Sequence, residues 1–255
     1  MSNPDSDSAM CDKYDACNNT GAIAQDDPLF IRSQALIGAE GVNRLRKLRV
    51  AVFGIGGVGG YTVEALARAG VGTLYLIDGD TISPSNINRQ LYALTSTIGQ
   101  HKTAAAAARI ADINPACTVH QLVQHILPDA DGSLSFLPLL SDIDCIVDAV
   151  DTISLKVALA AEAENRGIPI IAAMGCGNKL RADLFQFADI YDTAVCPLCK
   201  TMRGLLKKRG VKKLRVLYPK EVPSVRSRPP SSVSWVPAAA GILLAGDLLN
   251  QILQS

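Results

Sequence analysis

The sequence has few aromatic residues, which make up 5% of its 255 positions, and it contains only three histidines and one tryptophan. No apolar run approaches the roughly 18–20 residues that a helix needs to cross a bilayer, which argues against an integral membrane protein. The opening MSNPDSDS is polar and no hydrophobic stretch follows it, so we expect no secretory signal. Seven cysteines at irregular spacing give no disulfide framework, and a reducing cytoplasm is the expected location.

Charge is distributed unevenly along a chain whose net charge is only +1. Residues 1–27 are rich in Ser, Asn and Asp and are predicted to form a disordered acidic tail. With 48% apolar residues the chain can bury a sizeable core, so residues 28–255 are predicted to form a single domain. The pattern changes after residue 179, which separates a core, 28–179, from a C-terminal elaboration, 180–255.

Short strands and helices alternate over most of the chain. Strands are predicted at 49–53, 73–77, 118–123, 145–150 and 168–173, and helices at 28–45, 57–69, 102–113 and 154–165. This rhythm predicts an α/β fold with a Rossmann-like, doubly wound and mostly parallel sheet. In the C-terminal elaboration we expect strands at 180–188 and 214–218, a basic helix at 196–209 and a final helix at 237–253.

A glycine-rich segment, VFGIGGVGG at 52–60, ends the first predicted strand and begins a helix. This is the context in which such a turn binds nucleotide phosphates, because the helix offers free N–H groups and the positive end of its dipole. Gly54 allows a tight turn, Gly56 lets the backbone approach a phosphate, and Gly59 lets the helix pack on the strand. Asp78, at the end of the next strand, is suited to bind ribose hydroxyls.

The stretch LIDGDTISPSNINRQLY, residues 76–92, indicates which nucleotide binds. A dinucleotide's pyrophosphate needs little beyond the glycine turn, whereas a triphosphate needs further cations. Arg89 supplies a bidentate fork and Lys102 a point charge, and Asp151, just past the fourth strand, is a candidate ligand for Mg²⁺. Because the carboxyl ends of parallel strands meet in one crevice, these residues are expected to come together around ATP rather than NAD.

The same segments carry a family resemblance that extends from about Phe30 to the end of the chain. RVAVFGIGGVGGYTVEALARAGVGTLYLIDGDTISPSNINRQL and TSTIGQHKTAAAAARIADINP are similar to the ubiquitin-activating-type adenylyltransferases, which include activators of molybdopterin and thiamine sulfur carriers. NINRQL, MGCGNKL, ADIYDTAVCPL and MRGLLKKRGVKKLRVLY most resemble the branch of tRNA threonylcarbamoyladenosine dehydratases. The resemblance implies an enzyme that uses ATP and Mg²⁺ to dehydrate threonylcarbamoyladenosine in tRNA through an acyl-adenylate.

The resemblance also implies roles for individual residues. The nucleotide site would contain Gly54, Gly56, Gly57, Gly59, Asp78, Asp80, Asn86, Arg89, Gln90 and Lys102. Arg89, Lys102 and Asp151 would act in adenylation, with Asp151 assisting the metal, and Arg32 would reach into the site of the neighbouring subunit of a homodimer. Two simpler interpretations stay open: Arg32 as an ordinary surface residue of a helix, and Asp151 as the N-cap of the helix that follows it.

The segment CPLC at 196–199 would be half of a structural zinc site, which needs four ligands. No cysteine or histidine follows Cys199, so we expect no zinc, and this absence separates the sequence from the sulfur-carrier activators. A thioester-forming or redox role for Cys196 or Cys199, or an inert position at the start of a helix, remain as alternatives.

Residues 200–228 contain eleven lysines and arginines and a single acid, Glu221. Such a block predicts a local contact with an anionic partner, here the tRNA backbone, unless it is simply a solvated helix face. The residues proposed to contact RNA are Lys207, Lys208, Arg209, Lys212, Lys213 and Arg215.

The final helix is apolar around most of its circumference, which predicts burial on more than one side, in the domain's own core or in a twofold dimer. Three functions remain in competition. They are tRNA dehydration, adenylation of the C-terminal glycine of a ubiquitin-like or sulfur-carrier protein, and nucleotide binding without catalysis. A sulfur-relay protein is a further possible partner.

Overall fold

The computed structural model describes residues 27–134, 140, 142–225, 227 and 229–254. Its centre is a seven-stranded sheet in the order β3-β2-β1-β4-β5-β7-β6. The strands are β1 (Arg49–Phe53), β2 (Thr73–Ile77), β3 (Thr118–Leu122), β4 (Cys145–Asp148), β5 (Ile170–Ala173), β6 (Phe185–Asp189) and β7 (Arg215–Pro219). All neighbours pair in parallel except β6 and β7, which are antiparallel. The predicted α/β fold with a mostly parallel sheet is confirmed.

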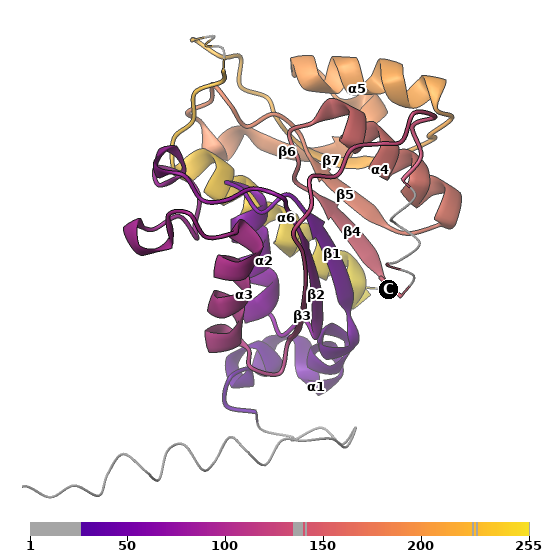
Figure 1. Ribbon diagram of the computed structural model, residues 1–255. Helices are drawn as coiled ribbons and strands as arrows, with labels where there is room; N and C mark the ends of the chain where they lie inside the picture. Colours follow the sequence, from indigo (N-terminus) through magenta and orange to yellow (C-terminus); the bar gives the residue numbers. More distant parts are fainter. Residues whose placement is uncertain (1–26, 135–139, 141, 226, 228, 255) are drawn as a thin grey trace, which may run out of the picture.

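Helices cover both faces of this sheet (Figure 1). They are α1 (Ile31–Lys47), α2 (Gly59–Arg68), α3 (Lys102–Ile113), α4 (Ile153–Arg166), α5 (Pro197–Lys208) and α6 (Trp235–Gln254). The alternation of side chains along β1 explains the two layers. Val50 and Val52 pack in the cluster that contains α2 and α6, whereas Ala51 and Phe53 pack on the other face with α4. Helix α5 packs beside α4.

Helix α6 crosses α2 at very close range. A Cβ atom at Gly241 would lie 2.3 Å from the Val58 carbonyl oxygen, so only glycine fits at this crossing. The Thr62 hydroxyl also donates to the Gly241 carbonyl oxygen at 3.0 Å, which links the two helices where they touch. By length and composition α6 is the one helix, among the residues described, that could cross a membrane, yet its inner face is buried against α2 and the sheet.

The C-terminal elaboration differs from expectation at one strand. The segment predicted as a strand at 180–188 begins instead with a 3-10 turn, Ala182–Leu184, and only then enters β6. Glu221 explains the delay, because its carboxylate accepts the backbone N–H groups of Leu180 and Arg181 at 2.9–3.0 Å, so these groups are not available to a strand. The predicted acidic tail lies outside the described residues, apart from Asp27, which pairs with Arg46.

Candidate functional site

A cavity of about 1230 Å³ opens at the carboxyl ends of β1, β2, β4 and β5. The strand order changes direction between β1 and β4: from β1 the chain proceeds outward to β2 and β3, and from β4 it proceeds the other way to β5. Parallel sheets form ligand crevices at such a point. The glycine turn, Asp78, Asp151 and the turn after β5 all line it, although they are far apart in sequence. A smaller cavity, of about 600 Å³, adjoins it and is lined by Asn86 as well as by Asp80, Arg89 and Lys102.

The glycine turn has the geometry that the sequence predicts. Gly54 has a positive φ of +84°, and a Cβ atom there would lie 2.8 Å from the Ala149 carbonyl oxygen. A Cβ atom at Gly59 would overlap the Gly54 carbonyl oxygen at 1.7 Å, so α2 can start where it does only with glycine. Gly56 and Gly57 line the cavity. At its glycines the turn therefore exposes backbone without side chains to the cavity at the N-terminus of α2.

Asp78 holds this turn as well as facing the cavity. Its Oδ2 accepts the Ile55 N–H at 2.7 Å, and its Oδ1 accepts the Asp80 N–H at 2.8 Å. Lys102 is buried at the first position of α3, with its Nζ 2.5 Å from Asp80 Oδ2 and 3.8 Å from Asp78 Oδ2. The cation predicted to meet a phosphate thus lies between two carboxylates, and a bound phosphate would have to share it with Asp80.

Arg89 and its neighbours form the wall beside this charge cluster. The Arg89 guanidinium donates to the Ser85 carbonyl oxygen at 2.7 Å and to Asn88 Oδ1 at 2.9 Å. Asn86 accepts the Ser83 N–H at 3.0 Å and so holds the 3-10 turn that carries this segment. Arg89 and Gln90 line both cavities. The structure therefore brings together the cations and amides that the sequence placed at the phosphates.

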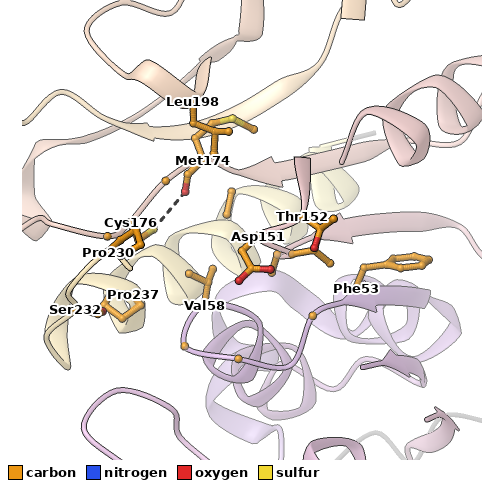
Figure 2. Close-up of a pocket in the computed structure, with 18 of the residues that line it drawn as sticks. Phe53, Val58, Asp151, Thr152, Met174, Cys176, Leu198, Pro230, Ser232 and Pro237 are labelled. Carbon is orange, nitrogen blue, oxygen red and sulfur yellow. Dashed lines mark hydrogen bonds between the residues drawn. The ribbon is translucent and has the colours of Figure 1, made fainter. Parts of the chain in front are cut away.

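Asp151 lies in the loop between β4 and α4 and lines both cavities. Figure 2 shows its carboxylate near the centre of the view. The residue before α4 is Thr152, and no side chain caps this helix, so the alternative interpretation of Asp151 as N-cap is wrong. Among the residues described, Asp151 has no ion-pair or hydrogen-bond partner, which leaves its carboxylate available to a ligand.

Sequence reasoning missed a buried ion pair under this loop. Asp148 and Lys156 are both fully buried, and Lys156 Nζ lies 3.0 Å from Asp148 Oδ2. Burial raises the pKa of the Asp148 carboxyl, and the lysine beside it acts in the opposite direction. Lys156 also donates to the Val150 carbonyl oxygen at 3.3 Å, and Asp148 accepts the Val150 N–H at 3.2 Å. The pair therefore holds the backbone next to Asp151.

Sequence reasoning also missed Lys179, which lines the cavity from the segment after β5 and is only 7% exposed. No carboxylate or carbonyl oxygen within the described part of the chain pairs with its ammonium group. The segment that carries it is held on both sides. Asn178, with φ of +57°, accepts the Ser231 N–H at 2.8 Å, and the Trp235 indole donates to the Leu180 carbonyl oxygen at 2.8 Å. The only sequence signal for Lys179 was its place in the segment MGCGNKL, which carries part of the family resemblance.

Two thiols, Cys176 and Cys196, also line the cavity. Cys176 donates to the Met174 carbonyl oxygen at 3.5 Å, the contact drawn as a dashed line in Figure 2. Burial raises the pKa of the Cys176 thiol to about 12. In the described part of the chain no three His, Cys, Asp or Glu side chains are grouped closely enough to hold a metal ion by themselves.

The remaining predicted residues lie away from the cavity. Arg32 is exposed on α1, at the amino ends of the strands, and does not line the cavity of its own chain. The basic segment falls into two groups. Arg209 donates to the carbonyl oxygens of Asp131 and Gly132, and Arg215 makes a bidentate contact with Asp247 at 2.5–2.6 Å. The other residues proposed to contact RNA, Lys207, Lys208, Lys212 and Lys213, are exposed, and Lys207 lies over the Tyr191 ring at 5.7 Å.

Comparison with known proteins agrees with this geometry. The family model described as the ThiF family matches residues 31–255. A tRNA threonylcarbamoyladenosine dehydratase of Bacillus subtilis is 39% identical over 244 residues, covering 88% of this chain and 94% of that protein. One of Haemophilus influenzae is 40% identical over 165 residues, covering 65% and 62%.

Among solved structures, the Escherichia coli tRNA N6-threonylcarbamoyladenosine dehydratase TcdA in complex with ATP superposes with a TM-score of 0.83. The two are 27% identical, and the match covers 91% of this chain and 98% of the other. The resemblance inferred from the sequence is confirmed. The chain belongs to the ThiF family and, within it, to the tRNA threonylcarbamoyladenosine dehydratases.

Proposed function

We propose that this protein dehydrates threonylcarbamoyladenosine in tRNA, using ATP to activate the substrate carboxylate as an acyl-adenylate. The observation that carries the proposal is the cavity itself, in which a glycine turn, the cations of Arg89 and Lys102 and the free carboxylate of Asp151 meet at the carboxyl edge of the sheet. The E. coli relative with the same fold was crystallised with ATP and with AMP. ATP and AMP are the nucleotides consumed and released by this reaction.

The nucleotide would lie along the glycine turn, with its ribose at Asp78. Gly56 and Gly57 would leave room for its phosphates at the start of α2, and Gly54 and Gly59 would allow the turn that brings the backbone there. Arg89 and Lys102 would neutralise the β- and γ-phosphates, with Asn86, Gln90 and Asp80 around them. This arrangement stabilises the charge that develops on pyrophosphate as it leaves.

Asp151 fits the binding of Mg²⁺, because its carboxylate is free and faces the cavity. Magnesium in nucleotide sites is commonly held by one or two carboxylates together with the phosphates, so a cage of protein ligands is not required. When bound, the ion would supply additional positive charge at the leaving pyrophosphate. Asp148 and Lys156 would keep the Asp151 loop in place from below.

We infer that Lys179 receives the carboxylate of the substrate. It is a buried cation without a partner in the described structure, and it lines the cavity from the side of β5, across from Asp78 and Lys102. A carboxylate held there would attack the α-phosphorus of ATP and expel pyrophosphate. The ureido group of the same side chain would then close on the activated carbonyl and expel AMP, with the net loss of one water.

The polynucleotide would contact the basic end of α5. This helix follows Cys196 at the cavity wall and spans 12 residues, so its last residue lies roughly 18 Å from the cavity wall. The exposed lysines there can follow the phosphate backbone while one nucleoside enters the cavity. Arg209 and Arg215 are engaged with protein groups, and we assign the larger part of this contact to Lys207, Lys208, Lys212 and Lys213.

We further propose that the active form is a homodimer. The outer face of α6 exposes Trp235, Ile242 and Leu243, at 52%, 56% and 39% exposure, on one stripe of the helix. An apolar stripe of this kind is suited to packing against its own copy. The part of α1 that follows its break at Gly38 touches the end of α6, where Arg44 donates to the Leu253 carbonyl oxygen, so a partner on this face would be close to that part of α1, and Arg32 lies before the break.

The test is incubation of the protein with ATP, Mg²⁺ and tRNA that carries threonylcarbamoyladenosine, followed by mass analysis of the nucleosides. We expect the modified nucleoside to lose one water while AMP and pyrophosphate appear in equal amounts. Unmodified tRNA serves as the control. ATP–pyrophosphate exchange that depends on a Gly-Gly-ended carrier protein, with no change in the nucleoside, would support the adenylation of a protein instead. Whether a sulfur-relay protein associates stays a prediction.

A further inference from the structure

The proposed reaction makes no use of the pair Cys196 and Cys199, which spans the first turn of α5. Cys196 is the residue before the helix, Pro197 is its first residue, and Cys199 is its third. Residues three apart in a helix have Cα atoms roughly 5 Å apart. A separation of this size lies within the range that a disulfide bond requires.

The backbone just before the pair has an unusual conformation. Val195 has φ of +66°, a left-handed conformation that a β-branched residue rarely adopts. The turn is closed by a hydrogen bond of 2.7 Å from the Cys196 N–H to the Ala194 carbonyl oxygen. Strain of this kind persists where the surrounding structure determines the position of a side chain. Cys196 follows this residue directly and is the N-cap of α5.

The Cys196 sulfur is surrounded by donors. The groups near it are first the Cys199 thiol, then the backbone N–H groups of Cys199 and Leu198 in α5 and of Gly175 after β5. These contacts lower the pKa of Cys196 to about 6, and the same contact raises that of Cys199. Cys176, the other titratable group facing Cys196, has a raised pKa and stays a thiol. The shift is in the direction that favours the thiolate of Cys196 and the thiol of Cys199.

Access to the two sulfur atoms is unequal. Cys196 lines the cavity, whereas Cys199 is fully buried behind it. Cys199 is in turn close to the Thr193 hydroxyl, which accepts a hydrogen bond from Arg203 at 2.5 Å. A small molecule that enters the cavity meets a nucleophilic sulfur first, and a second sulfur lies one helical turn behind it.

We propose that Cys196 and Cys199 form a site of reversible oxidation, at which a small peroxide entering the cavity converts the two thiols into a disulfide. The Cys196 sulfur attacks one oxygen of hydrogen peroxide, the O–O bond breaks, and water leaves, which makes Cys196 a sulfenic acid. The Cys199 sulfur then attacks the Cys196 sulfur, the S–O bond breaks, and a second water leaves. Two thiols and one peroxide thus give one disulfide and two waters.

The first experiment uses the full, reduced wild-type chain. After brief treatment with hydrogen peroxide at pH 7, peptide mapping without reductant should show Cys196 linked to Cys199, with the mass lower by two hydrogens and restored by a dithiol reductant. Cys117 is the internal reference, because burial raises its pKa to about 11. We expect Cys196 to react at least about 100-fold faster than Cys117, since the thiolate is the reactive form.

Two variants test the order of the steps. Cys199→Ser should accumulate the sulfenic acid at Cys196, detected as an adduct with dimedone, and Cys196→Ser should leave Cys199 unreactive because it is buried. The rate of alkylation of Cys196 in the wild type should rise through about pH 6 and then level off. The proposal is overturned if Cys196 reacts no faster than Cys117, or if fast oxidation of Cys196 yields no link to Cys199. None of these measurements depends on the catalytic activity proposed above.

Discussion

Replacing Lys179 by methionine should change activity and stability in opposite directions. Lys179 is 7% exposed and has no partner in the described structure, and its ammonium group is not fully enclosed, so without a ligand it loses part of its hydration and gains no ion pair. Methionine fills the same space without a charge and should stabilise the free protein by about 1 kcal/mol, or roughly 2–4 °C in Tm. A residue that is unfavourable for folding yet kept in a cavity is expected to serve a ligand.

In catalysis the same change removes one charge-assisted contact to the substrate carboxylate. Such contacts contribute roughly 1.5–3 kcal/mol, so kcat/KM for the modified tRNA should fall roughly 10- to 150-fold. The KM for ATP should be unchanged, because we propose that the nucleotide lies on the far side of the cavity. Lys179→Arg, which keeps the charge, should recover part of the activity, and Lys47→Met, an exposed lysine on α1, is the matched control.

The assay combines steady-state kinetics with varied tRNA and varied ATP and a thermal melt of each variant without ligand. A lower Tm for Lys179→Met would show that the ammonium group stabilises the fold, and the assignment would be wrong. A selective rise in the KM for ATP would place Lys179 at the phosphates instead. Activity equal to that of Lys47→Met would remove it from the site.

Three further predictions concern the other charged groups. Arg89→Ala should reduce adenylation roughly 10- to 150-fold with an unchanged Tm, measured by pyrophosphate release, and wild-type turnover would exclude a phosphate contact. Co-refolding inactive Arg32→Ala with inactive Arg89→Ala should restore part of the activity, because a mixed dimer has one complete site; dead heterodimers would show that Arg32 does not act in trans. Arg215→Ala should lower the Tm and leave tRNA binding largely intact, because its guanidinium contacts Asp247, whereas Lys208→Ala should weaken tRNA binding and lessen its salt dependence without changing the Tm. If Arg215→Ala weakened tRNA binding and Lys208→Ala did not, the RNA contact would belong to Arg215.

Stability should also depend on pH through Cys196. Its pKa is lowered on folding to about 6, so between about pH 6 and 9 the unfolded chain binds more protons than the folded one. The contribution is therefore present at alkaline pH and is lost as the pH falls through about 6. Urea unfolding of reduced protein at pH 6 and pH 8.5 should show a smaller difference in Cys196→Ser than in the wild type, and an equal difference would contradict the lowered pKa.

The sequence alone determined the local features whose cause is local. VFGIGGVGG requires a tight turn after a strand because only glycine tolerates the φ of Gly54 and the contact at Gly59, and the structure has that turn. The alternation of short apolar runs with helical segments predicted a mostly parallel sheet, and parallel strands place Asp78 and Asp151 at one edge. Arg89 and Lys102 were expected at that edge because a triphosphate demands cations there; both line the cavity, and their contact with phosphate stays a prediction.

Tertiary structure alone decided which charges are already engaged. Nothing in the order of residues indicates that Lys102 meets Asp80, that Arg215 meets Asp247, or that Lys179 meets no partner, because each outcome depends on contacts between distant segments. The pKa of Cys196 is lowered mainly by the nearby Cys199 thiol, which is close in sequence, and in smaller part by the Gly175 N–H, which belongs to a distant segment. Charge and hydrogen bonding depend on distances of a few ångströms in space, and the sequence specifies such distances only within a turn or a helix.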